Sequence, residues 1–357
     1  MATSSSAVTG EFRLIQSLAQ RYARPHPTVL RGIGDDAAVI APAAGRQIVL
    51  TTDLLAEGVH FDLKTASFED VGYKAAIANL SDVAAMGARP EHLLVALALP
   101  HSTNRTDVLR LYKGLMAACR PSRVALIGGD TSASASGLFL SLTVTGSAPS
   151  GSTLLRNGAR AGDLIYVTGT LGDSLAGLRL LSREGRKAAA RLDPSARRFL
   201  IARHRRPIAH CRLGQLLSRH RLASAAIDLS DGLSGDLRHI CTQSKVGAAI
   251  NISSLPLSPA LRAYARATRT DPAKLALQGG EDYELLFTVP PSKARRLERL
   301  AAQPGRRLTR IGVTTPVRSG LRMIDALGRS LPLPNLSYDH FRSPARRPTS
   351  RSREARR

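Results

Sequence analysis

Several residue types are scarce in this chain, and each scarcity argues against a class of protein. Tryptophan is absent and aromatic residues make up only 4% of the 357 residues. The basic segments therefore lack the interleaved rings that form a stacking platform for single-stranded nucleic acid. No stretch approaches the roughly eighteen apolar residues that a transmembrane helix needs. The N-terminus lacks a basic region followed by an apolar core, so we expect no secretory signal.

Cysteine is scarce as well, since only Cys119, Cys211 and Cys241 occur and none forms a Cys-x-x-Cys pair. Three widely spaced cysteines fit neither a disulfide framework nor a zinc site. We expect small buried side chains and a reducing, cytoplasmic location. Common catalytic motifs are also missing: there is no Gly-Lys-Ser/Thr phosphate loop, no His-x-x-x-His pair and no Gly-x-Ser-x-Gly elbow.

Acidic residues are outnumbered, because 51 basic and 27 acidic residues give a net charge of +24. Such a charge is typical of nucleic-acid-binding proteins. Much of the excess, however, lies in a largely helical stretch at 183–221 and in the tail at 342–357, and nearly all of it is arginine. We expect no membrane partner and no specific nucleic acid. A basic nucleic-acid-binding protein without enzymatic activity stays open as a rival.

The order of strand and helix patterns predicts an α+β protein with two mixed α/β domains. We expect a disordered N-terminus at 1–10, a first domain at 11–148, a second domain at 149–341 and a disordered arginine-rich tail at 342–357. The boundary is the turn-rich stretch around 148–152.

Within the first domain, a buried strand at 48–52 is expected to deliver Asp53 at its end. A helix is predicted at 68–86, with Gly87 as its stop. Further strands are expected at 92–99, 124–127 and 138–145, with a helix at 107–119. In the second domain we expect strands at 164–168, 225–227 and 284–289, and helices at 174–183, 195–205 and 209–219.

Five short acidic motifs stand out against the basic composition. They are Gly32-Ile33-Gly34-Asp35-Asp36, Thr51-Thr52-Asp53, Asn79-Leu80-Ser81-Asp82, Gly128-Gly129-Asp130 and Asp228-Leu229-Ser230-Asp231-Gly232. Carboxylates that converge repel each other unless a cation lies between them, and oxygen ligands of this kind suit Mg²⁺ together with phosphate. Each motif alone could be a surface turn or a helix cap. Together they predict a site for several magnesium ions and a phosphate-bearing ligand.

The first of these motifs also fits the dinucleotide pattern Gly-x-Gly-x-x-Ala, but two acids inside the turn would repel a pyrophosphate. A metal-binding turn is the better interpretation. The lone His60 is by default a packed or surface residue, although its place just after Thr51-Thr52-Asp53 raises the chance that it reaches a ligand.

The ordered motifs resemble those of the thiamine-monophosphate kinases, within the superfamily that includes aminoimidazole ribonucleotide synthetase. The most specific are the motifs at 32–36, 79–88, 127–131, 166–170, 227–233 and 279–285. The resemblance implies ATP-dependent phosphorylation of thiamine phosphate to thiamine diphosphate, the last step of thiamine diphosphate biosynthesis. It also implies a homodimer whose N-terminal domains pair strands into a shared β-barrel near the ATP site, and a C-terminal α/β sandwich domain that covers nucleotide and substrate.

The resemblance assigns site residues position by position. The implied magnesium ligands are Asp36, Thr51, Thr52, Asp53, Asp82, Asp130, Asp228 and Asp231. The implied ATP contacts are Gly129, Asp130, Arg156 and Ser230. The implied contacts of thiamine phosphate are His60, Glu281 and Tyr338.

No covalent nucleophile is expected, because the acceptor is itself a phosphate and direct in-line transfer needs mainly positioning and charge neutralisation. Another ATP-dependent enzyme of the superfamily, similar to aminoimidazole ribonucleotide synthetase, stays open as an alternative. A selenophosphate synthetase is less similar, since no cysteine precedes the first glycine-rich motif.

Overall fold

The computed structural model describes residues 17–18, 20–22, 25–31, 39–40, 42–182, 185–302 and 307–338. The motif at 32–36, and with it Asp36, lies outside these ranges. So do the two termini for which disorder is predicted, at 1–10 and 342–357.

The first half of the chain forms a four-stranded sheet in the order β3-β6-β4-β5. Its strands are β3 (Arg46–Ala56), β4 (Arg89–Pro100), β5 (Ala125–Ser134) and β6 (Phe139–Pro149). The β4 and β5 strands run parallel, and the other neighbours are antiparallel. The short strands β1 (Val29–Arg31) and β2 (Val39–Ile40) pair only with each other.

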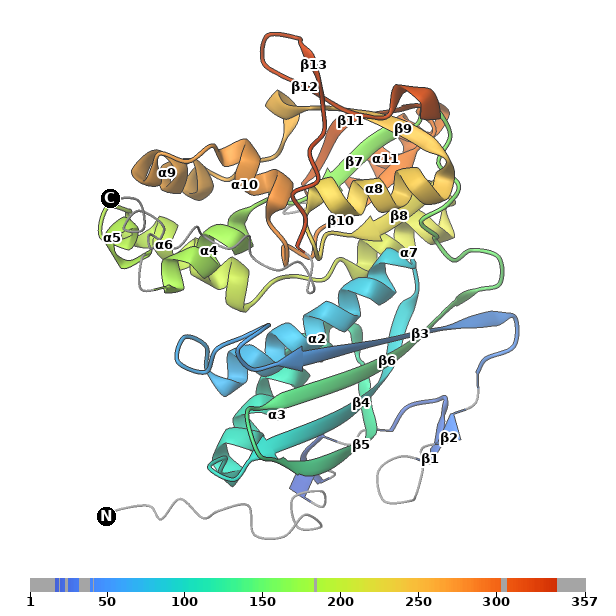
Figure 1. Ribbon diagram of the computed structural model, residues 1–357. Coiled ribbons are helices and arrows are strands. Elements are labelled where there is room, and N and C mark those ends of the chain that lie inside the picture. The colour runs from blue at the N-terminus through green and yellow to red at the C-terminus, as the bar shows by residue number, and fades with distance from the viewer. Residues whose placement is uncertain are drawn as a thin grey trace, which may run out of the picture.

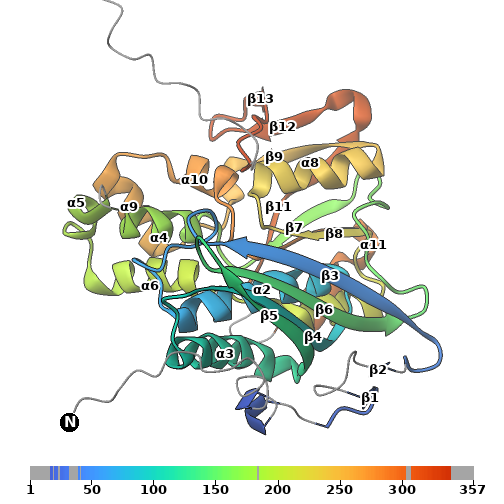
Figure 2. The same ribbon diagram turned by 60° about the horizontal axis from the view of Figure 1, so that its bottom comes forward.

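Helices α2 (Phe68–Ala85) and α3 (Arg105–Cys119) cover one face of this sheet (Figures 1 and 2). A capping box starts α2, because Ser67 accepts from the Asp70 amide and Asp70 accepts from the Ser67 amide. Gly87 follows the helix with φ +69°, and a Cβ there would lie 2.6 Å from the Ser218 Cβ. Only glycine fits that position, so the predicted helix stop is confirmed.

The second half forms a seven-stranded sheet in the order β13-β12-β9-β11-β7-β10-β8. Its strands are β7 (Leu164–Thr168), β8 (Ala225–Asp228), β9 (Val246–Asn251), β10 (Leu285–Val289), β11 (Leu308–Pro316), β12 (Leu321–Ile324) and β13 (Ser330–Pro332). All these neighbours are antiparallel except β12 and β9.

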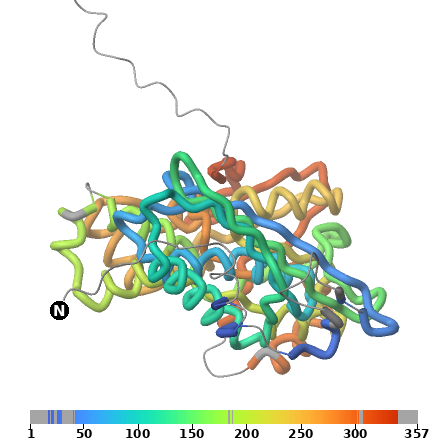
Figure 3. The backbone as a smooth tube through the Cα atoms, turned by 90° about the horizontal axis from the view of Figure 1, so that it is seen from below, coloured from blue at the N-terminus to red at the C-terminus, as the bar shows by residue number. Residues whose placement is uncertain are grey.

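The helices of the second half are α4 (Asp173–Leu181), α5 (Gly185–Ala189), α6 (Pro194–Arg205), α7 (Cys211–Arg219), α8 (Leu233–Ser244), α9 (Pro259–Thr268), α10 (Pro272–Gln278) and α11 (Pro291–Ala301). Short 3₁₀ helices lie at Arg120–Ser122, Ile252–Ser254 and Val317–Ser319. Seen from below, the blue-to-green first half of the chain lies in front of the yellow-to-red second half (Figure 3).

Both faces of the seven-stranded sheet are covered at its centre. Leu164, Tyr166 and Phe287 belong to a core that continues through α7 into the first domain. Ile165 and Leu286, which alternate with them, belong to a second core with α8, α9 and α10. Strands buried on both faces read as continuous apolar runs, which explains why β7 and β10 were predictable.

The prediction of small buried cysteine side chains is confirmed, because all three cysteines are free and buried. No helix in the described ranges is long and apolar enough to cross a membrane.

Two predicted strands are too short, and this changes where two acids lie. β3 continues to Ala56, so Asp53 lies within a strand and does not end one. β5 continues to Ser134, so Gly129 and Asp130 also lie within a strand. In both cases pairing with a neighbouring strand extends the ladder past the end of the apolar run. The six strands β1, β2, β9, β11, β12 and β13 and the four helices α5, α9, α10 and α11 were not predicted.

Candidate active site

Helix α2 lies between the two halves of the chain (Figure 1). Its side chains line two cavities. The first, here called the Arg156 cavity, is lined near the C-terminal end of α2 by Asp82, Ala85 and Met86. The second, here called the His60 cavity, is lined nearer its N-terminal end by Asp70 and Lys74 among others. Each cavity also takes residues from the second half of the chain, so both lie between the domains.

The Arg156 cavity has a volume of about 470 Å³ and brings together four of the predicted site residues: Thr51, Asp82, Arg156 and Asp228. The Thr51 hydroxyl donates to Asp82 Oδ2 at 2.5 Å. Next to Asp82, the Ser81 hydroxyl donates to Asp228 Oδ2 at 2.7 Å. These two hydrogen bonds join α2 to β3 on one side and to β8 on the other.

Burial raises the pKa of the carboxylates at this junction, and the charge of Asp82 adds to the effect at Asp53 and Asp228. Burial, and then the charge of Asp82, raise the pKa of Asp53 to about 6. Burial, followed by the charge of Asp82, raises the pKa of Asp228 to about 7. Burial also raises the pKa of Asp82, although the hydrogen bond from Thr51 and the charge of Arg156 act in the opposite direction. The protein alone therefore leaves negative charge here that a bound cation can neutralise.

The His60 cavity has a volume of about 540 Å³ and brings together a second set of predicted residues: Asp53, His60, Ser230, Asp231, Glu281 and Tyr338. The Ala56 amide donates to His60 Nδ1 at 3.0 Å, so the neutral ring carries its proton on Nε2. The Tyr338 amide donates to the Asp231 carbonyl at 3.1 Å. This contact places the last described residues beside the cavity.

Glu281 reaches the His60 cavity from a loop with unusual backbone angles. Its φ is +61°, and that of Tyr283 is +53°, a region in which residues other than glycine are strained. The Glu281 amide donates to the Ser230 carbonyl at 2.7 Å, and the Tyr283 amide donates to the Leu229 carbonyl at 2.9 Å. The loop is therefore tied to the Asp228-Leu229-Ser230-Asp231 motif.

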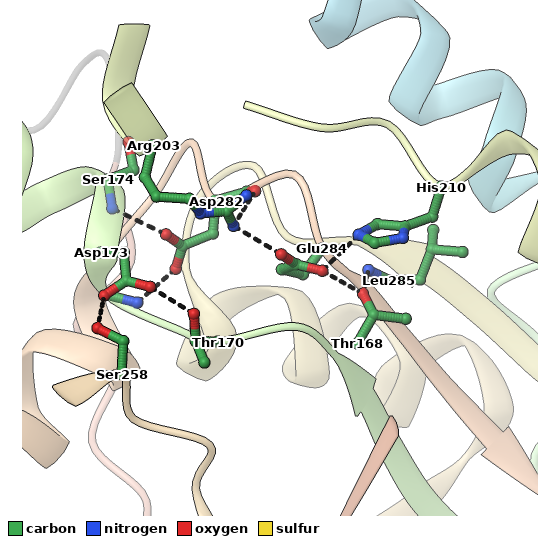
Figure 4. Close-up of polar contacts among 11 residues, drawn as sticks. Thr168, Thr170, Asp173, Ser174, Arg203, His210, Ser258, Asp282, Glu284 and Leu285 are labelled. Atoms are coloured by element: carbon green, nitrogen blue, oxygen red, sulfur yellow. Dashed lines mark hydrogen bonds and ion pairs between the residues drawn. The ribbon is translucent and has the colours of Figure 1, made fainter. Parts of the chain in front are cut away.

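Asp282 and Glu284, which follow Glu281 in the chain, belong to a buried polar network (Figure 4). The Asp282 carboxylate accepts from the Gly172 amide at 2.5 Å and from the Ser174 amide at 3.0 Å, which caps the N-terminus of α4. Glu284 accepts from Arg203 Nη2 at 2.6 Å, and His210 Nε2 lies 2.5 Å from its other oxygen.

Burial alone would raise the pKa of Glu284, but His210, Arg203 and Thr168 together lower it below its ordinary value. This side chain is therefore a stable anion in the interior. Asp282 and Glu284 therefore anchor the loop that carries Glu281 in the protein interior.

One further acid adjoins the site, and the sequence analysis did not select it. Asp236 is 2% exposed and its carboxylate accepts from the Gly232 amide at 3.0 Å. Burial, and then the charges of Asp228 and Asp231, raise its pKa to about 8. Asp236 lies in the first turn of α8, where acidic residues are common, so its sequence position gave no reason to select it.

Three of the predicted residues with described positions are not brought to the cavities. Thr52 points to the other face of β3 from Thr51 and Asp53, because side chains alternate along a strand, and its hydroxyl donates to the Leu142 carbonyl. Gly129 and Asp130 lie in β5, at the opposite edge of the sheet from β3. Both are exposed.

The register across the sheet shows how far away they are. Asp53 pairs with Leu142 of β6, which pairs with Val95 of β4, which pairs with Gly129 of β5. Three inter-strand steps separate Asp53 from Gly129, a distance of about 14 Å at the usual strand spacing. Within one chain, β5 does not reach the carboxylates on α2.

The donor set suits magnesium, since it consists of carboxylate and hydroxyl oxygens. Among the described residues, however, no group of three or more His, Cys, Asp or Glu side chains is arranged to hold one ion. These two findings agree with the chemistry of Mg²⁺, which commonly takes one or two carboxylates and completes its shell with water and substrate phosphate.

Family models match both halves of the chain. The model described as AIR synthase related protein, N-terminal domain, matches residues 34–148, and the corresponding C-terminal domain model matches residues 160–324. The fold is therefore the mixed α/β, two-domain fold of the AIR synthase related proteins.

Individual relatives show to which family among the AIR synthase related proteins the chain belongs. The thiamine-monophosphate kinase of Escherichia coli (strain K12) is 40% identical over 344 residues, which cover 94% of this chain and 99% of that protein. The crystal structure of thiamine-monophosphate kinase from Stenotrophomonas maltophilia K279a is 37% identical, has a TM-score of 0.77, and covers 91% of this chain and 98% of its own. AaThiL complexed with AMPPCP and TMP is 35% identical with a TM-score of 0.72, and covers 93% of this chain and 97% of its own. The chain belongs to the thiamine-monophosphate kinase family.

Proposed function

We propose that this protein transfers the γ-phosphoryl group of ATP to thiamine phosphate and so forms thiamine diphosphate and ADP. The observation that carries the proposal is the junction of two interdomain cavities at Asp53, which lines the His60 cavity and responds to the charge of Asp82 in the Arg156 cavity. A transfer between two phosphate-bearing ligands needs adjoining sites with carboxylates at their meeting point. The relative solved with both AMPPCP and TMP supports the same pair of ligands.

The Arg156 cavity suits the nucleotide. Arg156 is an exposed side chain in the cavity wall, and its planar guanidinium can bind phosphate oxygens in pairs. The His60 cavity suits the acceptor, because its wall combines apolar side chains such as Phe61 with polar groups from both domains. Such a mixed wall is typical of sites for organic ligands.

Asp53, Asp82, Asp228 and Asp231 are proposed to hold magnesium ions, which supply charge neutralisation to two phosphate groups that otherwise repel each other. Thr51 holds Asp82 in place through its hydroxyl, and Ser81 does the same for Asp228. The contributions of this chain are thus binding, orientation and exclusion of water, and no side chain is required as a nucleophile.

We also propose that the active form is a homodimer. Two features of the four-stranded sheet support it among the described residues. The face opposite α2 exposes apolar side chains, including Ile48, Leu50 and Leu54 of β3, at 44%, 66% and 59%. The edge strands β3 and β5 each pair with only one neighbour, and long free edges invite pairing with a second chain.

Pairing of β3 with β5 of a second copy would complete a barrel from two sheets and bring Gly129 and Asp130 of that copy toward Asp53. The contribution of Asp36 and the cytoplasmic location stay predictions.

The first experiment measures formation of thiamine diphosphate from ATP and thiamine phosphate with Mg²⁺, with free thiamine as the parallel acceptor. We expect product from the phosphate ester alone, and none after chelation of the metal. Product from neither acceptor, in folded protein, would overturn the proposal.

The shared site is tested by complementation between two inactive variants. Asp53→Asn and Asp130→Asn are each expected to be inactive, and co-expressed subunits are expected to regain activity, because the mixed dimer keeps one intact pair of acids. No recovery in a mixed dimer would place both acids in one chain. Ala96→Arg, on the exposed sheet face, is expected to give monomers by light scattering, whereas Leu327→Arg, 77% exposed near β12, is expected to leave the dimer intact.

A further inference from the structure

Lys74 is a buried cation in the wall of the His60 cavity that none of the roles above uses. It is 4% exposed, and its Nζ forms an ion pair with Glu281 Oε1. The same Nζ donates to the His60 carbonyl at 3.5 Å. Since Lys74 belongs to α2 and Glu281 to the loop before β10, the ion pair joins the two domains in the cavity wall.

His204 of α6 approaches the other oxygen of the same carboxylate. Its Nδ1 lies 3.4 Å from Glu281 Oε2 and 3.1 Å from the Ser174 hydroxyl oxygen. Burial, and then the charge of Lys74, lower the pKa of His204 to about 4, so the ring is neutral near neutral pH. A carboxylate can only accept a hydrogen bond, and the contact is attractive when Nδ1 carries the proton.

The backbone of Glu281 is fixed as well. Asp282 and Glu284, on either side of Tyr283, are anchored in the buried network of α4, Arg203 and His210 (Figure 4). Glu281 itself is 26% exposed at its side chain, so its carboxylate is held from two sides and still open to the cavity.

We propose that Lys74 and His204 are positioning residues that aim the Glu281 carboxylate at the amino-bearing ring of the acceptor substrate. The inference rests on the proposed function. A carboxylate attracts N–H donors and repels phosphate, so Glu281 selects the orientation in which the ring of thiamine phosphate meets it and the phosphate lies toward the Asp53 junction. Lys74 balances the charge of Glu281, so this end of the cavity does not repel the anionic ester as a whole.

The test is a double-mutant cycle on steady-state kinetics with Lys74→Met, Glu281→Gln and the double variant. Each single change is expected to raise KM for thiamine phosphate about tenfold, the range for hydrogen bonds to charged groups. The KM for ATP and kcat are expected to stay within about threefold. Because Lys74 acts through Glu281, the double variant should resemble Glu281→Gln alone.

Conservative variants separate positioning from loss of structure. Lys74→Arg keeps the charge and is expected to recover most of the affinity. His204→Asn keeps a donor near the Nδ1 position and should leave KM close to the wild-type value, whereas His204→Phe should raise it. Lys113→Met is the matched control, because Lys113 is also a helical lysine paired with a glutamate but is 65% exposed at its side chain.

The outcomes distinguish the inference from the function on which it rests. Additive effects in the double variant, about a hundredfold together, would show that Lys74 contacts the substrate directly and would overturn the inference. An unchanged KM for thiamine phosphate in folded Lys74→Met would also overturn the inference. If the Lys74 variants do not fold, the His204 variants decide, and equal KM values for His204→Asn and His204→Phe would overturn it. Wild-type protein without kinase activity would overturn the proposed function itself.

Discussion

The two cavities along α2 differ in how their acidic residues are balanced. In the His60 cavity, two of the acids have cations of the protein as partners: Glu281 pairs with Lys74, and Asp70 accepts from Arg206 Nε at 2.7 Å. In the Arg156 cavity, Asp82 and Asp228 have hydroxyl partners. Among the described residues that line this cavity, the exposed Arg156 is the only basic one.

This difference in charge explains the different ligands that we propose. The part of a cavity whose acids are paired with cations can recognise an organic molecule by shape and hydrogen bonds. A cavity whose acids repel each other gains most from bound metal ions and the phosphates that accompany them. Asp53 connects the two cavities, because it lines the His60 cavity and interacts with Asp82 of the Arg156 cavity.

The largest effect is expected at Asp82, which lines the Arg156 cavity and is one of the proposed magnesium ligands. We expect Asp82→Asn to lower kcat/KM at least about a thousandfold, since several kcal/mol of charge stabilisation are lost. Its melting temperature should not fall, because the substitution removes repulsion with Asp53 and Asp228. The control is Asp107→Asn on α3, and activity of Asp82→Asn within tenfold of wild type would break the comparison.

The next effect separates the two ligands. Arg156→Met should raise KM for ATP about 10- to 100-fold through the loss of a charged hydrogen bond, with KM for thiamine phosphate unchanged. Initial rates over a matrix of both substrates measure the two constants. Arg160→Met, another exposed arginine that lines neither cavity, serves as the control. An effect on the acceptor instead would reverse our assignment of the cavities.

His60 gives the mirror image of that experiment. We expect His60→Ala to raise KM for thiamine phosphate about tenfold or less and to leave KM for ATP unchanged. His60→Asn keeps an acceptor for the Ala56 amide but lacks Nε2. It therefore separates the hydrogen bond to the backbone from a contact between Nε2 and the substrate. If His60→Asn has the wild-type KM for thiamine phosphate, the His60 ring holds the backbone in place and does not contact the substrate.

The smallest effect concerns stability without metal. The pKa values of Asp53 and Asp228 are raised in the folded state to about 6 and about 7, so their contribution to stability is present at low pH and is lost as pH rises from about 4 to 7. Metal-free protein should therefore lose a few degrees of melting temperature over this range, and Mg²⁺ should restore them at pH 7.5.

Calorimetry or dye-based melting measures this effect. Asp228→Asn is the internal comparison, since it removes the more strongly shifted group while its amide oxygen still accepts from Ser81. A metal-free wild type whose melting temperature is as insensitive to pH as that of Asp228→Asn would argue against the uncompensated charge in the Arg156 cavity.

Local patterns in the sequence predicted much of this molecule. The periodicity of 68–86, the capping box and Gly87 define α2 because they act within a few residues. The acidic motifs likewise selected residues that lie together, since Thr51, Asp82 and Asp228 line one cavity with Arg156. Their role as magnesium ligands stays a prediction. Lys74 left a signal that the sequence analysis did not use: it is a charged residue among the apolar residues Val71, Ala75, Ile77 and Ala78 of the same helix.

The tertiary structure alone decided what depends on pairing between distant segments. Strand pairing carried β3 past Asp53 and placed Asp130 at the far edge of the sheet. Packing of α2 against both domains created the Lys74–Glu281 pair, and burial raised the pKa of Asp228. Residue type and spacing determine local conformation and the chemistry on offer, whereas the distances and desolvation that tune this chemistry arise only when remote parts of the chain pack together.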